Sequence, residues 1–352
     1  MNQSFHKIKM RILYLSKNLK NYKSANYQKE FLNALSRATS LFVYGPGYSY
    51  FDKNKKLDDI LRIYGPFNII FVGHSWLEDG YERKFDPWPQ SGLSNTSHKK
   101  FLFLNKEYTN LNKKLRWIKK NKFDYVFSHH QNCQMWQTKV KTQFKHLPFA
   151  YDDDYFFYSK KKRKYDLAFS GILQNSLKDK VQSDIRIRVL NRLYFTLFNI
   201  PLFKRKKYRH LSIFWNSVPN NFLGNIISRV FKIYKFLDKK KYAQLHKDSK
   251  TFLNCKSPMN LISPRYVENI ASGCIVITEK NNELKKLLPK FSYVEFSSDL
   301  SNFDQALNKS LINFDGLKKK REHNAKLIKQ NHTWNCRVKI VLKMIKNVVK
   351  VN

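Results

Sequence analysis

Short runs of hydrophobic residues alternate along this chain with longer segments in which hydrophobic residues recur every third or fourth position. The runs "NIIFVG" (68–73) and "FLFL" (101–104) are continuous and end at turn residues, as strands buried on both faces of a parallel sheet do. In the longer segments the spacing predicts amphipathic helices, for example with Tyr27, Phe31 and Leu35 on one face. Strands separated by helices predict right-handed crossovers and a parallel sheet with helices on both faces.

The alternation occurs twice, on either side of the segment "YDDDYFFYSKKKRK" (151–164). This segment is an acidic cluster followed by a basic run, which indicates a connection between domains. The first series predicts strands at 8–15, 41–44, 68–73, 101–104, 124–127 and 146–149, with helices from residue 24, at 57–65 and at 107–120. The second series predicts strands at 165–171, 210–215, 251–254, 274–278 and 293–296, with helices at 183–194, two between 221 and 247, one at 264–272 and others to the end.

We therefore expect an α/β protein with two Rossmann-like doubly wound domains, residues 1–150 and 151–330. Ligands of such sheets bind outside the carboxyl ends of the strands, where the strand order reverses. With two domains of this kind, the cleft that they face is the expected site.

Composition and charge narrow the class of protein. At 352 residues and 42% hydrophobic content the chain can bury two cores, which excludes a disordered protein. The 67 Lys and Arg residues against 26 Asp and Glu give a net charge of +41, which attracts nucleic acid, anionic lipid or phosphorylated small molecules. Because Lys is spread along the whole chain and Asn is abundant beside it, biased composition is an equal explanation.

Cysteine usage and hydropathy bear on the compartment. Cys133, Cys255, Cys274 and Cys336 are far apart and form no CxxC pair, so neither a zinc module nor a disulfide framework is expected. No apolar run approaches the length of a membrane span, and "MNQSFHKIKM" has no apolar signal core. We expect a cytoplasmic protein, with a peripheral position on the inner face of the membrane as an addition.

The most sharply patterned stretch is "SPRYVENIASGCIVIT" (263–278). Ser263 is a suitable N-cap, Pro264 suits the first helical position, and Gly273 suits the residue that ends the helix. The start of such a helix offers free amides and a positive dipole end to an anion such as a diphosphate. Arg265 adds a cation there, and Glu268 can accept two hydrogen bonds from a diol such as a ribose. The alternative is a surface ion pair between Arg265 and Glu268.

This stretch resembles the donor-binding signature of GT-B glycosyltransferases, most closely the CgeB-like branch of glycosyl transferase group 1. Further stretches resemble the family in matching order. They are "LPFAYDDDYF" (147–156), "KYDLAFSGIL" (164–173) and "HTWNCRVKIVLKMI" (332–345). The resemblance spans most of residues 145 to 350, and it implies the GT-B fold, in which residues 331–352 form a terminal helix that packs back on the first domain.

The resemblance also implies roles for single residues. Glu268 would bind the donor ribose, Ser263 and Arg265 would bind the diphosphate, and Gly171 would allow close approach of the phosphates. Many retaining members carry a second glutamate eight positions before this one, and here that position is Asn260. The sequence therefore leaves open whether transfer retains or inverts the anomeric configuration.

Histidines after predicted strands of the first domain are candidates for the catalytic base. His74 follows the strand at 68–73 and resembles, in position, a histidine that approaches the transferred sugar in several group 1 enzymes. His129, followed by His130, comes after the strand at 124–127 and is the second candidate. The carboxylates nearest His74 are those of Glu78, Asp79 and Glu82, which allows an inverting mechanism with a general base. The alternatives are structural histidines and an acidic solvated loop.

The segment "NNFLGNIISRVFKIYKFLDKKKYAQL" (220–245) mixes large apolar residues with lysine. It suits the surface of an anionic membrane, where lipid-linked acceptors reside. The preferred interpretation is a helix that faces the core and has a basic outer side.

The resemblance implies a glycosyltransferase that moves a sugar from a nucleoside diphosphate sugar to the hydroxyl of a glycan or lipid-linked acceptor, in surface-polysaccharide or glycoconjugate synthesis. No DxD motif occurs at a predicted strand end, since Asp152 to Asp154 lie in the junction. We expect no metal and no other cofactor. The alternatives are a basic nucleic-acid-binding protein, which we do not favour, and a GT-B protein that has lost catalysis.

Overall fold

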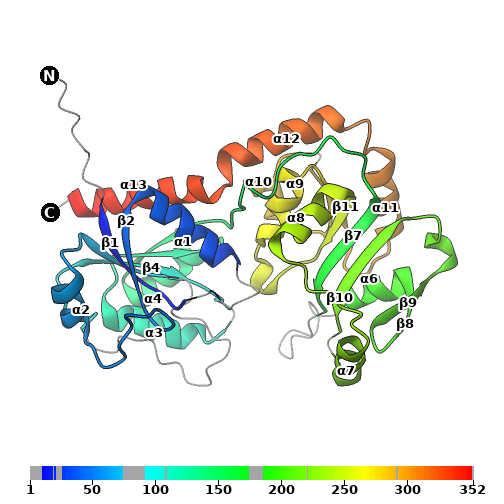
Figure 1. The fold of residues 1–352 in the computed structure, drawn as a ribbon. Helices are drawn as coiled ribbons and strands as arrows, with labels where there is room; N and C mark the ends of the chain where they lie inside the picture. The colour runs from blue at the N-terminus through cyan, green and yellow to red at the C-terminus, as the bar shows by residue number, and fades with distance from the viewer. Residues whose placement is uncertain are drawn as a thin grey trace. The chain divides into compact units, whose positions relative to one another are not determined.

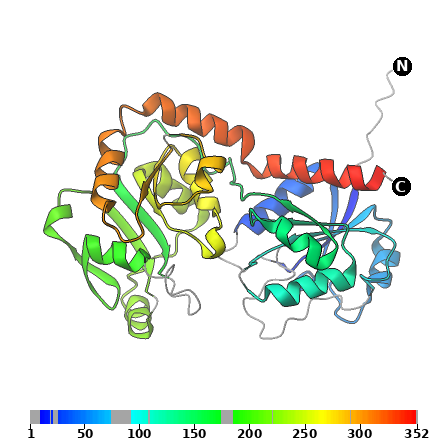
Figure 2. The ribbon, with the colours of Figure 1, turned by 180° about the vertical axis from the view of Figure 1, so that it is seen from behind.

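The structure is a computed structural model, and it describes residues 10–18, 20, 26–73, 92–107, 109–173, 185–219, 221–290 and 292–350. The chain divides into two compact units (Figures 1 and 2). The first unit consists of Met1–Ala150 and Trp334–Asn352, and the second of Tyr151–Thr333. Among the described residues, no helix has the length and apolar character that a membrane span requires.

The first unit is built on a fully parallel six-stranded sheet of order β2-β1-β3-β4-β5-β6. Its strands are β1 (Arg11–Leu15), β2 (Ser40–Tyr44), β3 (Ile69–Val72), β4 (Lys99–Leu104), β5 (Tyr125–Ser128) and β6 (Gln143–His146). Its helices are α1 (Asn26–Ala38), α2 (Leu57–Tyr64), α3 (Leu111–Asn121), the short η1 (Cys133–Trp136) and α4 (Gln137–Val140), and α13 (Trp334–Lys350).

One face of this sheet is covered by α1 and α13, which lie side by side (Figure 1, blue and red). Phe31 from α1 packs edge-on against Phe103 of β4 and against Trp334 of α13. The Trp334 indole Nε1 donates a hydrogen bond of 2.7 Å to the Glu30 carboxylate of α1. The last helix of the sequence therefore belongs to the core of the first unit.

The second unit has a fully parallel five-stranded sheet of order β10-β7-β11-β12-β13 and a separate antiparallel hairpin, β8-β9. Its strands are β7 (Tyr165–Ile172), β8 (Tyr194–Leu197), β9 (Ile200–Lys204), β10 (Ile213–Val218), β11 (Ser249–Asn254), β12 (Ile275–Glu279) and β13 (Tyr293–Phe296). Its helices are α6 (Ile185–Leu193), η2 (Lys206–Tyr208), α7 (Phe222–Val230), α8 (Lys239–Asp248), η3 (Pro258–Asn260), α9 (Pro264–Ala271), α10 (Leu284–Leu287), α11 (Phe303–Ile312) and α12 (Lys318–Asn331).

The pleat of β7 shows how the second sheet is covered on both faces. Leu167 and Phe169 point into a core with residues of α6 and α11, whereas Ala168 between them packs toward α8 on the opposite face. In both sheets the first strand in sequence lies between the second and the third, so the strand order reverses beside it. That reversal falls between β1 and β3 in the first unit and between β7 and β11 in the second.

The predicted α/β fold class with two parallel sheets is confirmed, and two local predictions are wrong. The last strand of the first sheet is β6 (Gln143–His146), which ends at the first residue of the "HLPF" run expected to form it. The helix expected at 183–194 ends at Leu193, and Tyr194 begins the unpredicted hairpin. Its two turn residues, Phe198 and Asn199, both have positive φ, of 49° and 61°. That conformation is the type I′ turn, which the sequence conceals because neither residue is glycine.

Candidate functional site

The carboxyl ends of β7 and β11 lie next to each other where the strand order of the second sheet reverses. Three segments meet there: residues 171–173 at the end of β7, residues 255–263 after β11, and the start of α9. Parallel sheets of this order bind ligands outside these strand ends, because the two loops diverge and leave a crevice. This edge of the second unit is the candidate site.

Helix α9 starts and stops at this edge as its sequence predicts. Ser263 is the N-cap residue with extended backbone (φ −66°, ψ 161°), and Pro264 occupies the first turn, but the Ser263 side chain makes no capping hydrogen bond. At the other end, the Gly273 amide donates to Ile270 and the Cys274 amide to Asn269, which together form a Schellman motif. The helix is one residue shorter than expected. Because no side chain caps the start of α9, the first amides of the helix stay free near the carboxyl end of β11.

Arg265 lies directly against Gly171, at the end of β7. A Cβ atom on Gly171 would come within 3.3 Å of Arg265 Nη2, so a side chain there would press on the guanidinium. The Arg265 Nε donates to the Tyr242 hydroxyl at 3.2 Å, and the guanidinium carbon lies 5.9 Å from the centre of the Phe169 ring. Two residues that were singled out from distant parts of the sequence thus meet at one place.

A second guanidinium, that of Arg186, reaches the same edge, and sequence reasoning missed it. Arg186 lies in the first turn of α6, and its Nη1 donates to the Ile172 carbonyl oxygen at 2.7 Å. Burial is the main cause that lowers the pKa of Arg186, and the positive charge of Arg265 also lowers it. Burial raises the pKa of Cys255, just after β11, to about 12, and both arginines oppose that rise.

Glu268 is half-buried one turn further along α9 and influences the same guanidinium. Burial on its own would lower the pKa of Arg265, but Tyr242 and the Glu268 charge outweigh it, and the pKa is raised. Arg265 is therefore held in its charged form. Because the Arg265 Nε is directed to Tyr242, the arginine is anchored to α8 rather than only to its own helix.

Two more polar residues at the strand ends were not singled out from the sequence. Asn254 ends β11 with 1% of its surface exposed, and neither its side-chain oxygen nor its nitrogen has a hydrogen-bond partner in the described structure. Glu279 ends β12, and its Oε2 accepts the Lys256 amide at 3.1 Å, which ties the loop after β11 to the next strand. Their only sequence signal was their place at the end of an apolar run.

Of the two candidate bases, His74 and its neighbours Glu78, Asp79 and Glu82 lie outside the described residues. His129 is buried, with its Nδ1 2.8 Å from the Leu147 carbonyl oxygen and its ring stacked on Phe149 at 3.6 Å between centroids. Burial lowers the pKa of His129 to about 3. His129 is therefore a packed, neutral core side chain, and we do not assign it the role of base.

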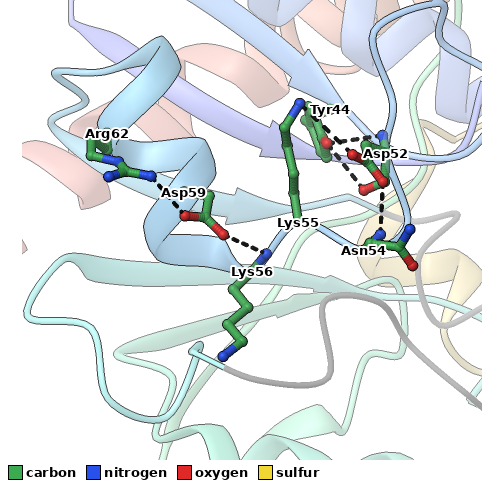
Figure 3. A network of polar contacts seen from close by, with 7 residues as sticks. All are labelled: Tyr44, Asp52, Asn54, Lys55, Lys56, Asp59 and Arg62. Carbon is green, nitrogen blue, oxygen red and sulfur yellow. Dashed lines mark hydrogen bonds and ion pairs between the residues drawn. The ribbon is translucent and has the colours of Figure 1, made fainter.

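The loop after β2 in the first unit is held by a polar network (Figure 3). The Asp52 amide donates to the Tyr44 hydroxyl at 3.0 Å, and its carboxylate accepts the Asn54 amide at 2.9 Å. The Asp59 carboxylate accepts the Lys56 amide and also pairs with Arg62 at 3.0 Å. These contacts fix the loop and the start of α2, so this network is structural.

Two further features of the structure bear on where ligands could bind, namely clusters of metal-ligating residues and a cavity. Among the residues that the structure describes, no three His, Cys, Asp or Glu side chains gather as a metal site would require. A cavity of about 580 Å³ opens between β13 and α11, lined by Ile275, Tyr293 and Gln305 among others. Ile275 and Tyr293 are the first residues of their strands, so this cavity lies at the amino edge, away from the crevice.

Comparisons with known proteins agree with this architecture. Residues 201–343 match the model of a protein family described as glycosyl transferase-like. A glycosyltransferase from Rickettsia africae shares 11% identity at a TM-score of 0.63, with 98% of this chain and 100% of that one covered. HepE from Anabaena, solved with UDP and glucose, shares 12% identity at a TM-score of 0.57, with 96% and 100% covered. An E. coli structure described as trehalose-6-phosphate bound with UDP-2-fluoro glucose shares 11% identity at a TM-score of 0.60, with 96% and 99% covered.

No curated protein matches the chain. The solved structures confirm the GT-B fold class, and together with the family model they confirm the resemblance to GT-B glycosyltransferases. They do not single out the CgeB-like branch. The matched range includes Arg265 and Glu268, while Gly171 and Arg186 precede it.

Proposed function

We propose that this protein is a glycosyltransferase that binds a nucleoside diphosphate sugar at the carboxyl edge of its second sheet and transfers the sugar to an acceptor hydroxyl. The observation that carries the proposal is the meeting of Arg186 and Arg265 beside Gly171. Two like-charged guanidiniums lie at the edge where parallel sheets bind ligands. A diphosphate would satisfy both, since arginine pairs with phosphate oxygens through parallel hydrogen bonds.

The surroundings suit the rest of a nucleotide. The first turn of α9 offers free amides and the Ser263 hydroxyl to the same phosphates. Glu268, one turn further on, would accept hydrogen bonds from the ribose diol. The relatives solved with UDP and glucose or with UDP-2-fluoro glucose support a nucleotide-sugar as the donor.

In the proposed reaction the acceptor oxygen attacks the anomeric carbon and the bond from that carbon to the diphosphate breaks. The acceptor proton passes to a base, for which His74 stays the sequence-based prediction, and the nucleoside diphosphate departs. Arg186, Arg265 and the helix dipole would stabilise the negative charge of the departing diphosphate, which can replace a metal ion. A strict requirement for Mn²⁺ would contradict that part. A glycan or lipid-linked acceptor in surface-polysaccharide or glycoconjugate synthesis is the substrate we propose.

The first test is isothermal titration with UDP, ADP and GDP, followed by titration of variants with the diphosphate that binds best. We expect Arg186→Gln and Arg265→Gln each to weaken binding by about 1.5–3 kcal/mol, because a hydrogen bond to a charged group is lost. Arg188→Gln is the matched control, since Arg188 lies on the same helix but donates to the Ser298 carbonyl oxygen instead. Glu268→Gln should weaken binding through the ribose.

The results separate the proposal from its rivals. Unchanged affinity in both arginine variants, or binding of none of the three diphosphates, would overturn the assigned site. Tight diphosphate binding without transfer or donor hydrolysis, in an assay across nucleotide-sugars, would indicate a GT-B protein that has lost catalysis. Tight RNA or DNA binding with a steep salt dependence, and no effect of the arginine variants on it, would favour the nucleic-acid-binding alternative.

A further inference from the structure

Large apolar side chains are exposed on one part of the second unit, formed by the β8-β9 hairpin and α7. These two elements lie side by side (Figure 1), and the Asn221 side chain at the start of α7 donates to the Phe198 carbonyl oxygen in the hairpin turn at 3.0 Å. Phe222 is 78% exposed, Phe231 72% and Val230 68%. The other exposed members are Leu197, Phe198, Leu202, Phe203, Leu223 and Ile226. We call this set the hairpin–α7 face.

Helix α7 buries its small residues and exposes its large apolar residues, the reverse of an ordinary surface helix. Its buried residues are the small Gly224 and Ser228, and a Cβ atom on Gly224 would come within 2.4 Å of the Phe198 carbonyl oxygen. The hairpin turn therefore requires the small face of α7 to point inward. The large apolar residues of the helix are left on the outside, and the expectation that this segment faces the core is wrong for α7.

The charge around this face is predominantly positive. Between Tyr194 and Leu237 the sequence contains no Asp or Glu. The basic residues in that range are Lys204, Arg205, Lys206, Lys207, Arg209, Arg229, Lys232 and Lys235, and all except the partly buried Lys204 are exposed. Asp304 of α11 pairs with one of them, Lys207, at 2.7 Å. An apolar surface bordered mainly by cations combines the two features by which proteins rest on an anionic bilayer.

We propose that the hairpin–α7 face docks on the surface of an anionic lipid bilayer. Phe222, Val230 and Phe231 would enter the boundary between headgroups and acyl chains, while Lys206, Lys232 and their neighbours contact lipid phosphates. A second copy of the chain is disfavoured as the occupant, because it would bring two predominantly basic surfaces together. Nucleic acid would satisfy the cations but leave the branched aliphatic side chains without a partner. The proposal does not depend on sugar transfer.

The test is flotation of the full chain with phosphatidylcholine vesicles that contain or lack phosphatidylglycerol. We expect binding to the anionic vesicles only, weakened by salt. The double variant Phe222→Ser/Phe231→Ser should lower vesicle affinity at least about tenfold. Ile312→Ser is the matched control, since Ile312 is 80% exposed on α11, outside the face. These positions are exposed, so the variants should keep their circular dichroism and diphosphate binding.

The charge is tested separately. Lys206→Gln/Lys232→Gln should lower affinity for anionic vesicles by roughly tenfold, and Lys318→Gln/Lys319→Gln, on exposed positions of α12, should change it much less. Equal binding of the wild type and the Phe222→Ser/Phe231→Ser variant would overturn the proposal. Absence of vesicle binding would also overturn it. In that case a dimer in light scattering that Phe222→Ser/Phe231→Ser dissociates would identify a second copy as the occupant, and RNA binding that the same variant abolishes would identify RNA. Vesicle binding without any diphosphate binding would leave this proposal standing and remove the proposed function.

Discussion

At the carboxyl edge of the second sheet, Arg186 and Arg265 bring two positive charges to the end of β7. Burial and the charge of Arg265 lower the pKa of Arg186, while Arg265 keeps a raised pKa through Tyr242 and Glu268. Two like-charged groups at one edge raise the free energy of the unliganded protein, and the diphosphate that we propose would offset that cost. Burial has a different consequence at His129. It lowers the pKa of the imidazole, so we do not assign His129 the role of catalytic base.

His129 leads to a prediction about pH. In the unfolded chain its imidazole gains a proton below its usual pKa of about 6.5, whereas in the folded protein the pKa is about 3. Between these values the unfolded state binds more protons, so acidification lowers the free energy of unfolding as pH falls through this window. We expect His129→Asn, which keeps a donor for the Leu147 carbonyl oxygen, to reduce this loss. The measurement is the urea midpoint of the full chain at several pH values.

The control is His323→Asn, at an exposed position on α12. If both variants lose stability with acid as steeply as the wild type, His129 is not one of the groups responsible. His146 is a half-buried histidine of the first unit, and desolvation lowers its pKa to about 4, so part of the slope should remain in His129→Asn.

Among the elements, α9 combines a precise stop with an open start. The Schellman motif requires Gly273 in the left-handed region, with φ of +79°, and its hydrogen bonds fix where β12 begins. The open start leaves amides and the Ser263 hydroxyl toward the crevice. A helix of this kind is short because its two ends are both determined by the site and the sheet.

We predict that Gly273→Ala destabilises the protein by about 1–3 kcal/mol. Alanine would have to adopt the left-handed backbone of Gly273, and its Cβ atom would lie 2.7 Å from Tyr158 Cδ2. Gly316→Ala is the control, because the nearest atom to its added Cβ is the Asn313 carbonyl oxygen at 4.0 Å. Thermal unfolding of both variants decides the matter, and equal stability would show that Gly273 is not needed for its conformation.

For the whole molecule, the first unit is built from two separate segments of the sequence. The first unit takes its last helix, α13, from the end of the sequence, after the entire second unit. Val338, Val341 and Ile345 of α13 are buried in the same core as Phe31 and Phe71. The first core is therefore complete only when the last residues of the chain are present.

We predict that Ile345→Ala lowers the stability of the first unit by about 2–5 kcal/mol, because it leaves a cavity in a fully buried position. Ile340→Ala makes the same chemical change five residues earlier on α13, where the side chain is 39% exposed, and should cost less than about 1 kcal/mol. Urea unfolding followed by tryptophan fluorescence measures both. Similar losses would mean that α13 is not anchored by its buried face.

How far the sequence reaches can be seen in particular elements. The apolar runs predicted ten of the strands that the structure describes, among them β3, β7 and β12, because a strand buried on both faces leaves a pattern of its own. The β8-β9 hairpin was missed, since its turn residues carry no glycine and its side chains are exposed on one side. Ser263, Gly273 and the site residue Arg265 were readable because caps and helix starts depend on neighbours in sequence.

The sequence alone therefore determined the class of the fold, the position and ends of α9, and the candidacy of Gly171, Arg265 and Glu268. Only the tertiary structure decided that Arg186 lies at the same edge, because its side chain turns back from α6 to the Ile172 carbonyl oxygen at the end of β7. The parallel pairing of β7 with β11 brings the distant segment of Arg265 to that edge. Tertiary packing likewise decided that His129 is buried and that α7 turns its large residues outward. Local patterns record which side chains avoid water, whereas the partner that each side chain meets is fixed by the topology of the sheets.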